Sequence, residues 1–195
     1  MVIRNYIESD ERNWLRCRMA SFLDCSYYND VKTKKEIYEH PSICLVAEDK
    51  GVLVGFIDAE LDSNDLACNN GERGAVIWHL GVLPEYRKKG VAKQLWLRVK
   101  EQLLQREIHY CEVWTQEDIP ANLFYRSMGF ILEKSQTWLR CYVSGKQCMN
   151  LLNRDMARNI YGVEEMVFDV PATQKDKWKD MCFRMDEVRL YRISF

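Results

Sequence analysis

A short segment near the middle of the chain constrains the fold more than any other part of the sequence. The apolar run Ala75–Val82 predicts a strand, and Pro84 ends it because proline cannot donate to a strand ladder. A basic loop at residues 87–90 follows and leads directly into Val91–Arg106, whose apolar residues recur with the period of a helix. A strand that turns through such a loop into a helix predicts a layered α/β structure.

The loop has the chemistry of an anion-binding site. Successive backbone N–H groups at the start of a helix point toward one spot, where the helix dipole is positive. Gly90 lets the backbone approach a phosphate without a Cβ in the way, and Arg87, Lys88 and Lys89 add positive charge. The glycine pattern matches neither a P-loop nor a dinucleotide fingerprint. Taken alone, the segment fits either a phosphate site or a solvated basic turn.

The other patterns predict a mixed sheet with helices. The expected strands are Val2–Ile7, a hairpin over Ser42–Leu61, Glu112–Thr115, Phe130–Trp138 and Val188–Phe195. The expected helices are one after Glu8 that buries Trp14, Leu15, Met19 and Phe22, then Val31–Glu39, Ala121–Met128 and Met149–Arg158. Since no repeat or linker interrupts them, residues 1–195 are expected to form a single domain. Its core would cover residues 1–140, and residues 141–195 would return a final strand to the sheet.

Charge and composition exclude several classes of protein. The chain has 28 basic and 29 acidic residues, so it lacks the basic surplus of a nucleic-acid-binding protein. It has no apolar run long enough for a membrane helix and no signal-like start, so we expect a soluble, cytoplasmic protein. The eight cysteines have no C-x-x-C spacing and do not cluster with the three histidines. We therefore expect reduced cysteines and no metal, and a homodimer stays open.

A second segment, Asn122–Phe130, reads Asn-Leu-Phe-Tyr-Arg-Ser-Met-Gly-Phe. Together with Val-Leu-Pro-Glu-Tyr-Arg-Lys-Lys-Gly-Val-Ala at residues 82–92, it resembles the paired motifs of the GNAT superfamily of N-acetyltransferases. The resemblance covers residues 2–140 and implies a central, mostly antiparallel sheet flanked by helices. Shorter segments, such as residues 16–24, resemble a group of bacterial GNAT proteins of about this length with no assigned substrate.

The resemblance implies acetyl-CoA as the donor and a primary amine, on a small molecule or a peptide, as the acceptor. It places the pyrophosphate on the loop backbone and the pantetheine arm on the strand before it. The residues assigned to CoA in this way are Leu80, Val82, Arg87, Lys88, Lys89, Gly90, Val91, Ala92 and Asn122.

Tyr125 matches the family's tyrosine that protonates the departing thiolate. A phenol with a pKa of about 10 can protonate a thiolate with a pKa of about 8.5. The alternative is an aromatic core residue on a short helix.

The proton acceptor is less defined. Members of the family often use a carboxylate on the fourth strand, and here that strand offers His79, whose imidazole has suitable chemistry. A packed structural histidine is the alternative. Asp58 and Glu60, at alternate positions of the third strand, could bind or deprotonate the amine, or could form a solvated strand face.

These observations predict an N-acetyltransferase in which the amine attacks the thioester directly within a ternary complex. A covalent acetyl-enzyme is disfavoured because no cysteine occupies a motif position. The alternative is a non-catalytic acyl-CoA-binding or regulatory protein on the same fold. Antibiotics, polyamines, amino acids and proteins all stay open as acceptors.

Overall fold

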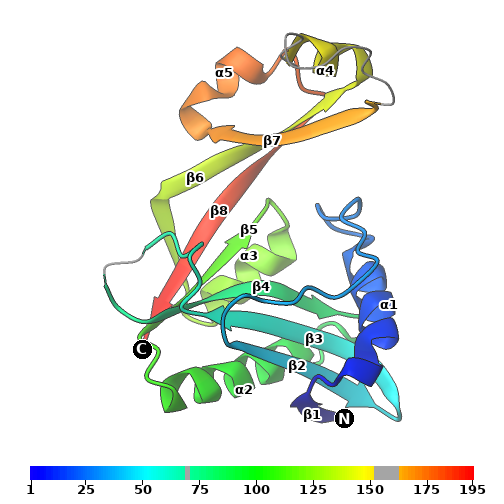
Figure 1. Cartoon of the computed structure of the whole chain (residues 1–195), viewed down its shortest axis with the longest axis vertical. Coiled ribbons are helices and arrows are strands. Elements are labelled where there is room, and N and C mark those ends of the chain that lie inside the picture. Colours follow the sequence, from blue (N-terminus) through cyan, green and yellow to red (C-terminus); the bar gives the residue numbers. More distant parts are fainter. Residues whose placement is uncertain (69–70, 152–162) are drawn as a thin grey trace.

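Most of the chain folds around one sheet, and the computed structural model describes residues 1–68, 71–151 and 163–195. Within these residues the strands are β1 (Val2–Asn5), β2 (Ser42–Asp49), β3 (Val52–Leu61), β4 (Gly74–Val82), β5 (Tyr110–Thr115), β6 (Ile131–Ser144), β7 (Glu165–Pro171) and β8 (Arg184–Ser194). The helices are α1 (Glu11–Phe22), α2 (Val91–Gln105), α3 (Ile119–Ser127), α4 (Gly145–Leu151) and α5 (Lys175–Trp178). The strand order is β1-β2-β3-β4-β5-β8-β6-β7, antiparallel except between β4 and β5 (Figure 1). The predicted mixed fold with a mostly antiparallel sheet is confirmed.

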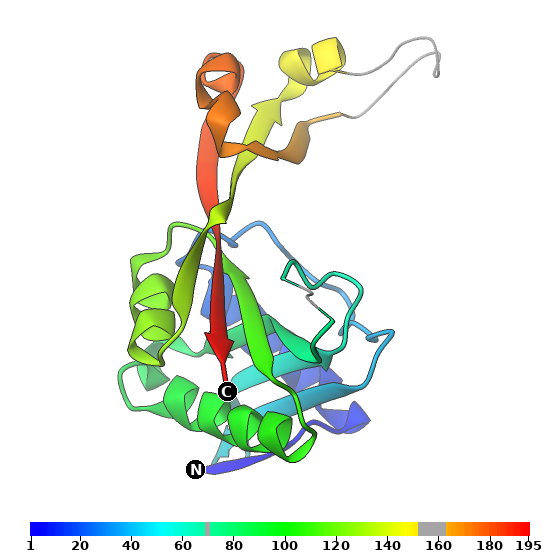
Figure 2. The same ribbon diagram turned by 90° about the vertical axis from the view of Figure 1, so that its left-hand side faces the viewer.

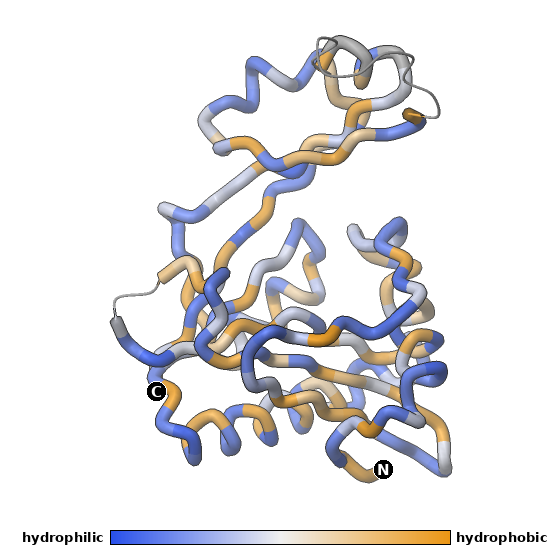
Figure 3. The backbone as a smooth tube through the Cα atoms, in the orientation of Figure 1, coloured by the Kyte–Doolittle hydropathy of each residue, from blue (hydrophilic) through white to orange (hydrophobic). Residues whose placement is uncertain are grey.

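Helices cover both faces of the sheet. α2 packs against β2, β3 and β4 through buried residues that include Leu95 and Val99. Along α2, hydrophobic and hydrophilic residues alternate, as expected of a helix with one buried face (Figure 3). α1 packs against β3 and β4, where the rings of Trp14 and Phe56 lie 5.1 Å apart. The sheet therefore has one hydrophobic cluster under α2 and a second one under α1.

Three of the four residues predicted for the buried face of α1 contact the core: Trp14 is buried, and Leu15 and Phe22 pack partly buried against its cluster. The buried residues of α1 are Trp14, Cys17, Arg18 and Ser21, whereas Met19 is 52% exposed. Arg18 is tolerated inside because its guanidinium donates to the carboxylate and to the backbone carbonyl of Asp30, each at 2.6 Å. A prediction based on the spacing of apolar residues does not place Arg18 on the buried face of α1, because the bond to Asp30 that permits its burial cannot be read from that spacing.

The helix predicted at Val31–Glu39 is absent from the structure. The segment instead crosses the α1 side of the sheet without regular structure. Lys35 and Tyr38 both bind Asp58, at 2.8 Å and 3.1 Å, and Glu36 binds His79 at 3.0 Å. These side-chain anchors fix an extended path that local helix propensity cannot override.

β4 and β5 separate part of the way along their length, and this separation positions the site. Parallel pairing joins Gly74–Ile77 to Tyr110–Val113 and then stops. β4 nevertheless continues to pair with β3 as far as Val82. The outer half of β4 therefore has β3 on one side and an opening on the other.

The last part of the chain builds an arm. β6 and β8 run out beyond the core together, and β7, α4 and α5 lie at their outer end (Figures 1 and 2). β8 begins before the predicted Val188 and lies between β5 and β6, with Leu190 and Tyr191 fully buried. Most of the helix predicted at Met149–Arg158 falls on residues outside the described ranges.

The cysteines at all eight positions are free. In the part of the chain that the structure describes, no helix has the length and apolar character needed to cross a membrane.

Candidate active site

A cavity of about 970 Å³ opens where β4 and β5 separate. Its walls come from the outer half of β4, the end of β5, the start of α2, α3, the segment after α1 and the base of the arm. This volume is at the upper end of the range for small-molecule sites. The cavity therefore lies next to the anion-binding loop that the sequence predicts.

The start of α2 fits a phosphate group. Gly90 caps the helix with φ +80°, a left-handed conformation that glycine adopts without strain. A Cβ built at this position would meet only Nε2 of Gln94, at 3.8 Å, so the space in front of the backbone is open. The first N–H groups of a helix have no intrahelical acceptor, and Val91 and Ala92 line the cavity. The backbone here has the conformation and the open space that a phosphate site needs, and its binding of CoA stays a prediction.

Two of the basic side chains predicted to bind CoA, Arg87 and Lys89, contact groups of the protein itself. Arg87 lines the cavity, but its guanidinium donates to the backbone carbonyls of Ser21 at 2.8 Å and Val82 at 3.3 Å. The ammonium of Lys89 lies 5.1 Å from the ring centre of Tyr86. Arg87 therefore ties the loop to the end of α1. Lys88 lines the cavity, whereas Lys89 does not.

The edge of β4 offers backbone groups to an extended ligand. Leu80 and Val82 line the cavity beyond the last residue that pairs with β5. An unpaired strand edge binds extended chains through its N–H and C=O groups. This edge matches the predicted place of the pantetheine arm.

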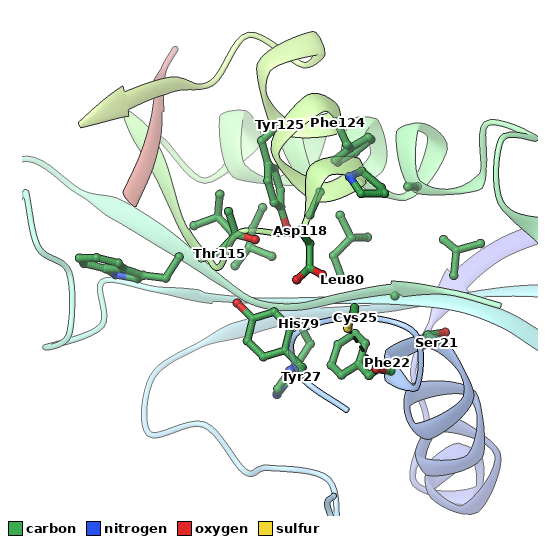
Figure 4. Close-up of a pocket in the computed structure, with 18 of the residues that line it drawn as sticks. Ser21, Phe22, Cys25, Tyr27, His79, Leu80, Thr115, Asp118, Phe124 and Tyr125 are labelled. Carbon is green, nitrogen blue, oxygen red and sulfur yellow. Dashed lines mark hydrogen bonds between the residues drawn. The ribbon is translucent and has the colours of Figure 1, made fainter. Parts of the chain in front are cut away.

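Tyr125 extends from α3 toward β4 (Figure 4). The residue is 6% exposed, and burial raises the pKa of its phenol well above the usual value. Its hydroxyl has no hydrogen-bond partner among the described residues, although the residue lines the cavity. The phenol therefore keeps its proton at neutral pH and has it free to donate into the cavity.

His79 lies on the opposite side of β4 from Tyr125 (Figure 4). Its Nε2 is 3.0 Å from Oε2 of Glu36, and its ring lies edge-on to Trp14 at 5.7 Å. Burial acts to raise the pKa of Glu36, but hydrogen bonds from His79 and Lys32 outweigh it and hold that pKa below its usual range. His79 and Tyr125 both line the cavity, but β4 separates them.

The structure places Asp58 and Glu60 away from the cavity. Asp58 is fully buried against Lys35, and Glu60 accepts hydrogen bonds from the His40 backbone at 3.0 Å and Trp78 Nε1 at 2.8 Å. Neither residue lines the cavity. The prediction that they bind the acceptor amine is corrected, because both carboxylates lie outside the cavity wall and are bonded to groups of the protein itself, Asp58 through Oδ2 only.

Asn122 also differs from its predicted role. Its Nδ2 donates to the backbone carbonyls of Gln116 and Asp118 at 2.7 and 2.8 Å, and its Oδ1 accepts from the Tyr191 hydroxyl at 2.9 Å. The residue is buried and is not part of the cavity wall. In this structure Asn122 holds the turn between β5 and α3 instead of facing a CoA arm.

The side chains of the cavity that sequence reasoning missed include Cys25, Tyr27 and Asp118 (Figure 4). Burial raises the pKa of the Cys25 thiol, whose Sγ donates to the Phe22 carbonyl at 3.1 Å. Asp118 alone had a local signal, because it stands directly before Ile119-Pro120 as a helix cap. The other two lie in an irregular segment without a motif.

Comparison with known proteins connects this geometry to a family. The profile of the Acetyltransferase (GNAT) family matches residues 3–130, more than half of the chain. The chain belongs to the GNAT acetyltransferase family. The resemblance inferred from the paired motifs is thereby confirmed, and the GNAT match ends before the arm.

Two curated relatives of this GNAT chain are acetyltransferases. It is 27% identical over 135 residues to mycothiol acetyltransferase of Thermobifida fusca, which covers 65% of this chain and 42% of that protein. It is 30% identical over 111 residues to an acetyltransferase of Photorhabdus laumondii, which covers 57% of this chain and 69% of that protein. The chain thus spans less than half the length of the first relative.

Solved structures share the GNAT fold. The PaiA N-acetyltransferase of Thermoplasma acidophilum in complex with coenzyme A matches with a TM-score of 0.54 and 19% identity, over 68% of this chain and 90% of that one. The ribosomal-protein-alanine N-acetyltransferase of Brucella melitensis matches with a TM-score of 0.59 and 13% identity, over the whole of both chains. At these identities the likeness concerns the fold.

Proposed function

We propose that the protein is an N-acetyltransferase that moves the acetyl group of acetyl-CoA to a primary amine. The single observation that carries this proposal is the Tyr125 hydroxyl, which faces the cavity over the open edge of β4. A proton donor placed there fits a reaction that releases a thiolate. Membership of the GNAT family supports the same chemistry.

The residues present fit CoA. The open space in front of Gly90 and the free N–H groups at the start of α2 suit the pyrophosphate, with the positive end of the helix dipole behind them. The β4 backbone at Leu80 and Val82 suits the pantetheine arm, and a neighbouring amide would polarise the thioester carbonyl. Bound acetyl-CoA supplies the activated acetyl group.

In the proposed reaction the amine nitrogen attacks the carbonyl carbon of the thioester. The new C–N bond forms and the C–S bond breaks. The sulfur takes a proton from the Tyr125 hydroxyl, the nitrogen passes its proton to solvent water, and water then returns a proton to Tyr125. Direct attack is favoured over an acetyl-cysteine route, because Cys25 is held as a thiol by burial. A non-catalytic acyl-CoA-binding protein would have no use for a free phenol at this place.

Release of free thiol from acetyl-CoA over a panel of primary amines tests the proposal. We expect amine-dependent release together with the acetylated amine in the mass spectrum. Binding of CoA without release for any amine would favour the non-catalytic alternative.

A further inference from the structure

Among the described residues, Asp118 is the one carboxylate of the cavity wall with a buried oxygen to which no group of the protein donates. It follows β5 and lies on the same side of β4 as Tyr125 (Figure 4). Its Oδ1 accepts a hydrogen bond from the Ser26 backbone N–H at 2.9 Å. Its Oδ2 is buried and has no hydrogen-bond partner within the described residues. A buried carboxylate oxygen without a donor is costly, so a donor that arrives with a ligand would be bound strongly.

The cavity wall carries more basic than acidic side chains, but its carboxylates differ in how they are paired. Asp118 forms no ion pair with any described residue, whereas each other carboxylate of the wall lies against an arginine. These pairs are Arg18–Asp30 at 2.6 Å, Arg140–Asp169 at 2.9 Å and Arg87–Asp24 at 4.0 Å. Asp118 is therefore the one carboxylate of the wall that is not paired with a basic side chain of the described residues.

Two hydrogen bonds hold Asp118 and its partner Ser26 in place. Asn122 Nδ2 donates to the Asp118 carbonyl at 2.8 Å, on the helix that also carries Tyr125. From the arm, Arg184 donates to the Ser26 carbonyl at 2.8 Å. The carboxylate is thus preorganised, which limits the entropy that a bound amine would have to overcome.

We propose that Asp118 binds the ammonium group of the acceptor, and that the acceptor is a primary amine with an apolar, uncharged body. This inference rests on the proposed acetyl transfer. The cavity wall includes the aromatic and apolar residues Tyr27, Trp114, Trp138 and Val188, and the charged residues Arg140 and Asp169 of the same wall are already paired with each other. A carboxylate beside the amino group, as in an amino acid, would be repelled by Asp118.

Two probes that share one body test the charge requirement. 2-Phenylethylamine and phenylalanine differ by the carboxylate of the amino acid. Each is titrated calorimetrically into the full-length protein saturated with CoA, which carries no acetyl group to transfer. We expect phenylethylamine to bind at least about tenfold more tightly than phenylalanine.

Asp118→Asn tests the residue, and Asp176→Asn is the matched control. Asparagine keeps the size of the side chain and the hydrogen bond from Ser26, and Asp118 makes no side-chain cap bond to α3. We expect its dissociation constant for phenylethylamine to rise about tenfold to a hundredfold, with CoA affinity unchanged. Asp176 is 94% exposed on α5, so Asp176→Asn should bind both ligands like the wild type.

CoA affinity reports whether each variant is folded. If Asp118→Asn no longer binds CoA, Trp138→Ala replaces it, because Trp138 lies on the arm and is 38% exposed. That variant should weaken phenylethylamine binding severalfold and leave CoA binding intact.

Equal affinity of Asp118→Asn and wild type for phenylethylamine would overturn the assignment, as would tighter binding of phenylalanine. If Trp138→Ala is used, unchanged phenylethylamine binding overturns it too. Because these titrations need no turnover, they separate this inference from the proposed function. Absence of thiol release with every amine would count against acetyl transfer alone.

Discussion

The ammonium group of Lys35 lies 2.8 Å from Oδ2 of Asp58, and both side chains are almost completely buried. The rings of Tyr6, Trp14 and Tyr38 surround the ammonium with their centres 5.0, 5.2 and 4.9 Å away. Such ring faces stabilise a desolvated cation. The sequence predicts that Asp58 binds the amine of a substrate, but in the structure Asp58 binds the amine of Lys35.

Lys35→Met should lower the free energy of unfolding by about 3–5 kcal/mol, because it leaves the Asp58 carboxylate buried without its counter-ion. Urea denaturation measures this change. Lys179→Met is the control, since Lys179 forms an exposed pair with Asp176 and should have almost no effect. Equal unfolding midpoints for Lys35→Met and the control would show that the buried pair does not stabilise the fold.

Glu36 predicts a pH dependence of stability. Its pKa in the folded state lies below its ordinary value of 4.5, so its stabilisation is present above that value and is lost as the pH falls below it. The stability difference between wild type and Glu36→Gln should therefore be larger at pH 7 than at pH 3. A difference that stays constant, or grows in acid, would contradict the lowering of the Glu36 pKa by the hydrogen bonds from His79 and Lys32.

Gly90→Ala tests the phosphate site at the start of α2. Both Gly90 and Gly51 have φ +80°, and Gly51 lies in the β2–β3 turn with no atom within 4 Å of a built Cβ. Alanine at either position should cost about 1–2 kcal/mol of stability through backbone strain. Only Gly90→Ala should also weaken CoA binding, by about tenfold or more in calorimetry, because its methyl group faces the phosphate. Equal CoA affinity in both variants would remove this loop from the site.

Tyr125→Phe should lower kcat by about 10²–10⁴-fold with little change in CoA affinity, because it removes only the proton donor. Stability should change little, since the hydroxyl has no partner among the described residues. Tyr191→Phe is the contrasting variant: it loses hydrogen bonds with Asn122 and Arg126, so stability should fall while the rate is kept. An unchanged kcat for Tyr125→Phe would refute the acid assignment.

We propose that the arm and the core form one folding unit. A chain truncated at residue 140 loses β8, which lies between β5 and β6 and contributes Leu190 and Tyr191 to the core. We expect this chain to be unfolded or aggregated at 25 °C by circular dichroism and size-exclusion chromatography. A truncated chain as stable as the full protein would make the arm a separate domain.

Local signals allowed the β4–loop–α2 unit to be predicted from the sequence. Pro84 ends the strand and Gly90 starts the helix, and the structure has both boundaries there. The Ser42–Leu61 hairpin was predictable for the same reason, because two β-rich runs flank a turn with Gly51. Each of these elements depends on residues that are close in the sequence.

The rest depends on contacts between distant residues. The segment around Lys35 has the composition of a helix, but its path is set by Asp58 on another strand. Asp118 was overlooked because its significance comes from Ser26, on a loop far away in the sequence. Asn122 was assigned from a motif, and only the structure shows that its amide is bonded to backbone carbonyls and Tyr191.

The most direct test of the central claim is a crystal structure of the protein with acetyl-CoA. We expect the pantetheine arm to pair with β4 at Leu80 and Val82, with the pyrophosphate on the N–H groups at the start of α2. The thioester sulfur should lie within hydrogen-bond reach of the Tyr125 hydroxyl, at about 3–3.5 Å. A sulfur beyond the reach of Tyr125, or a CoA bound outside the opening between β4 and β5, would contradict the claim.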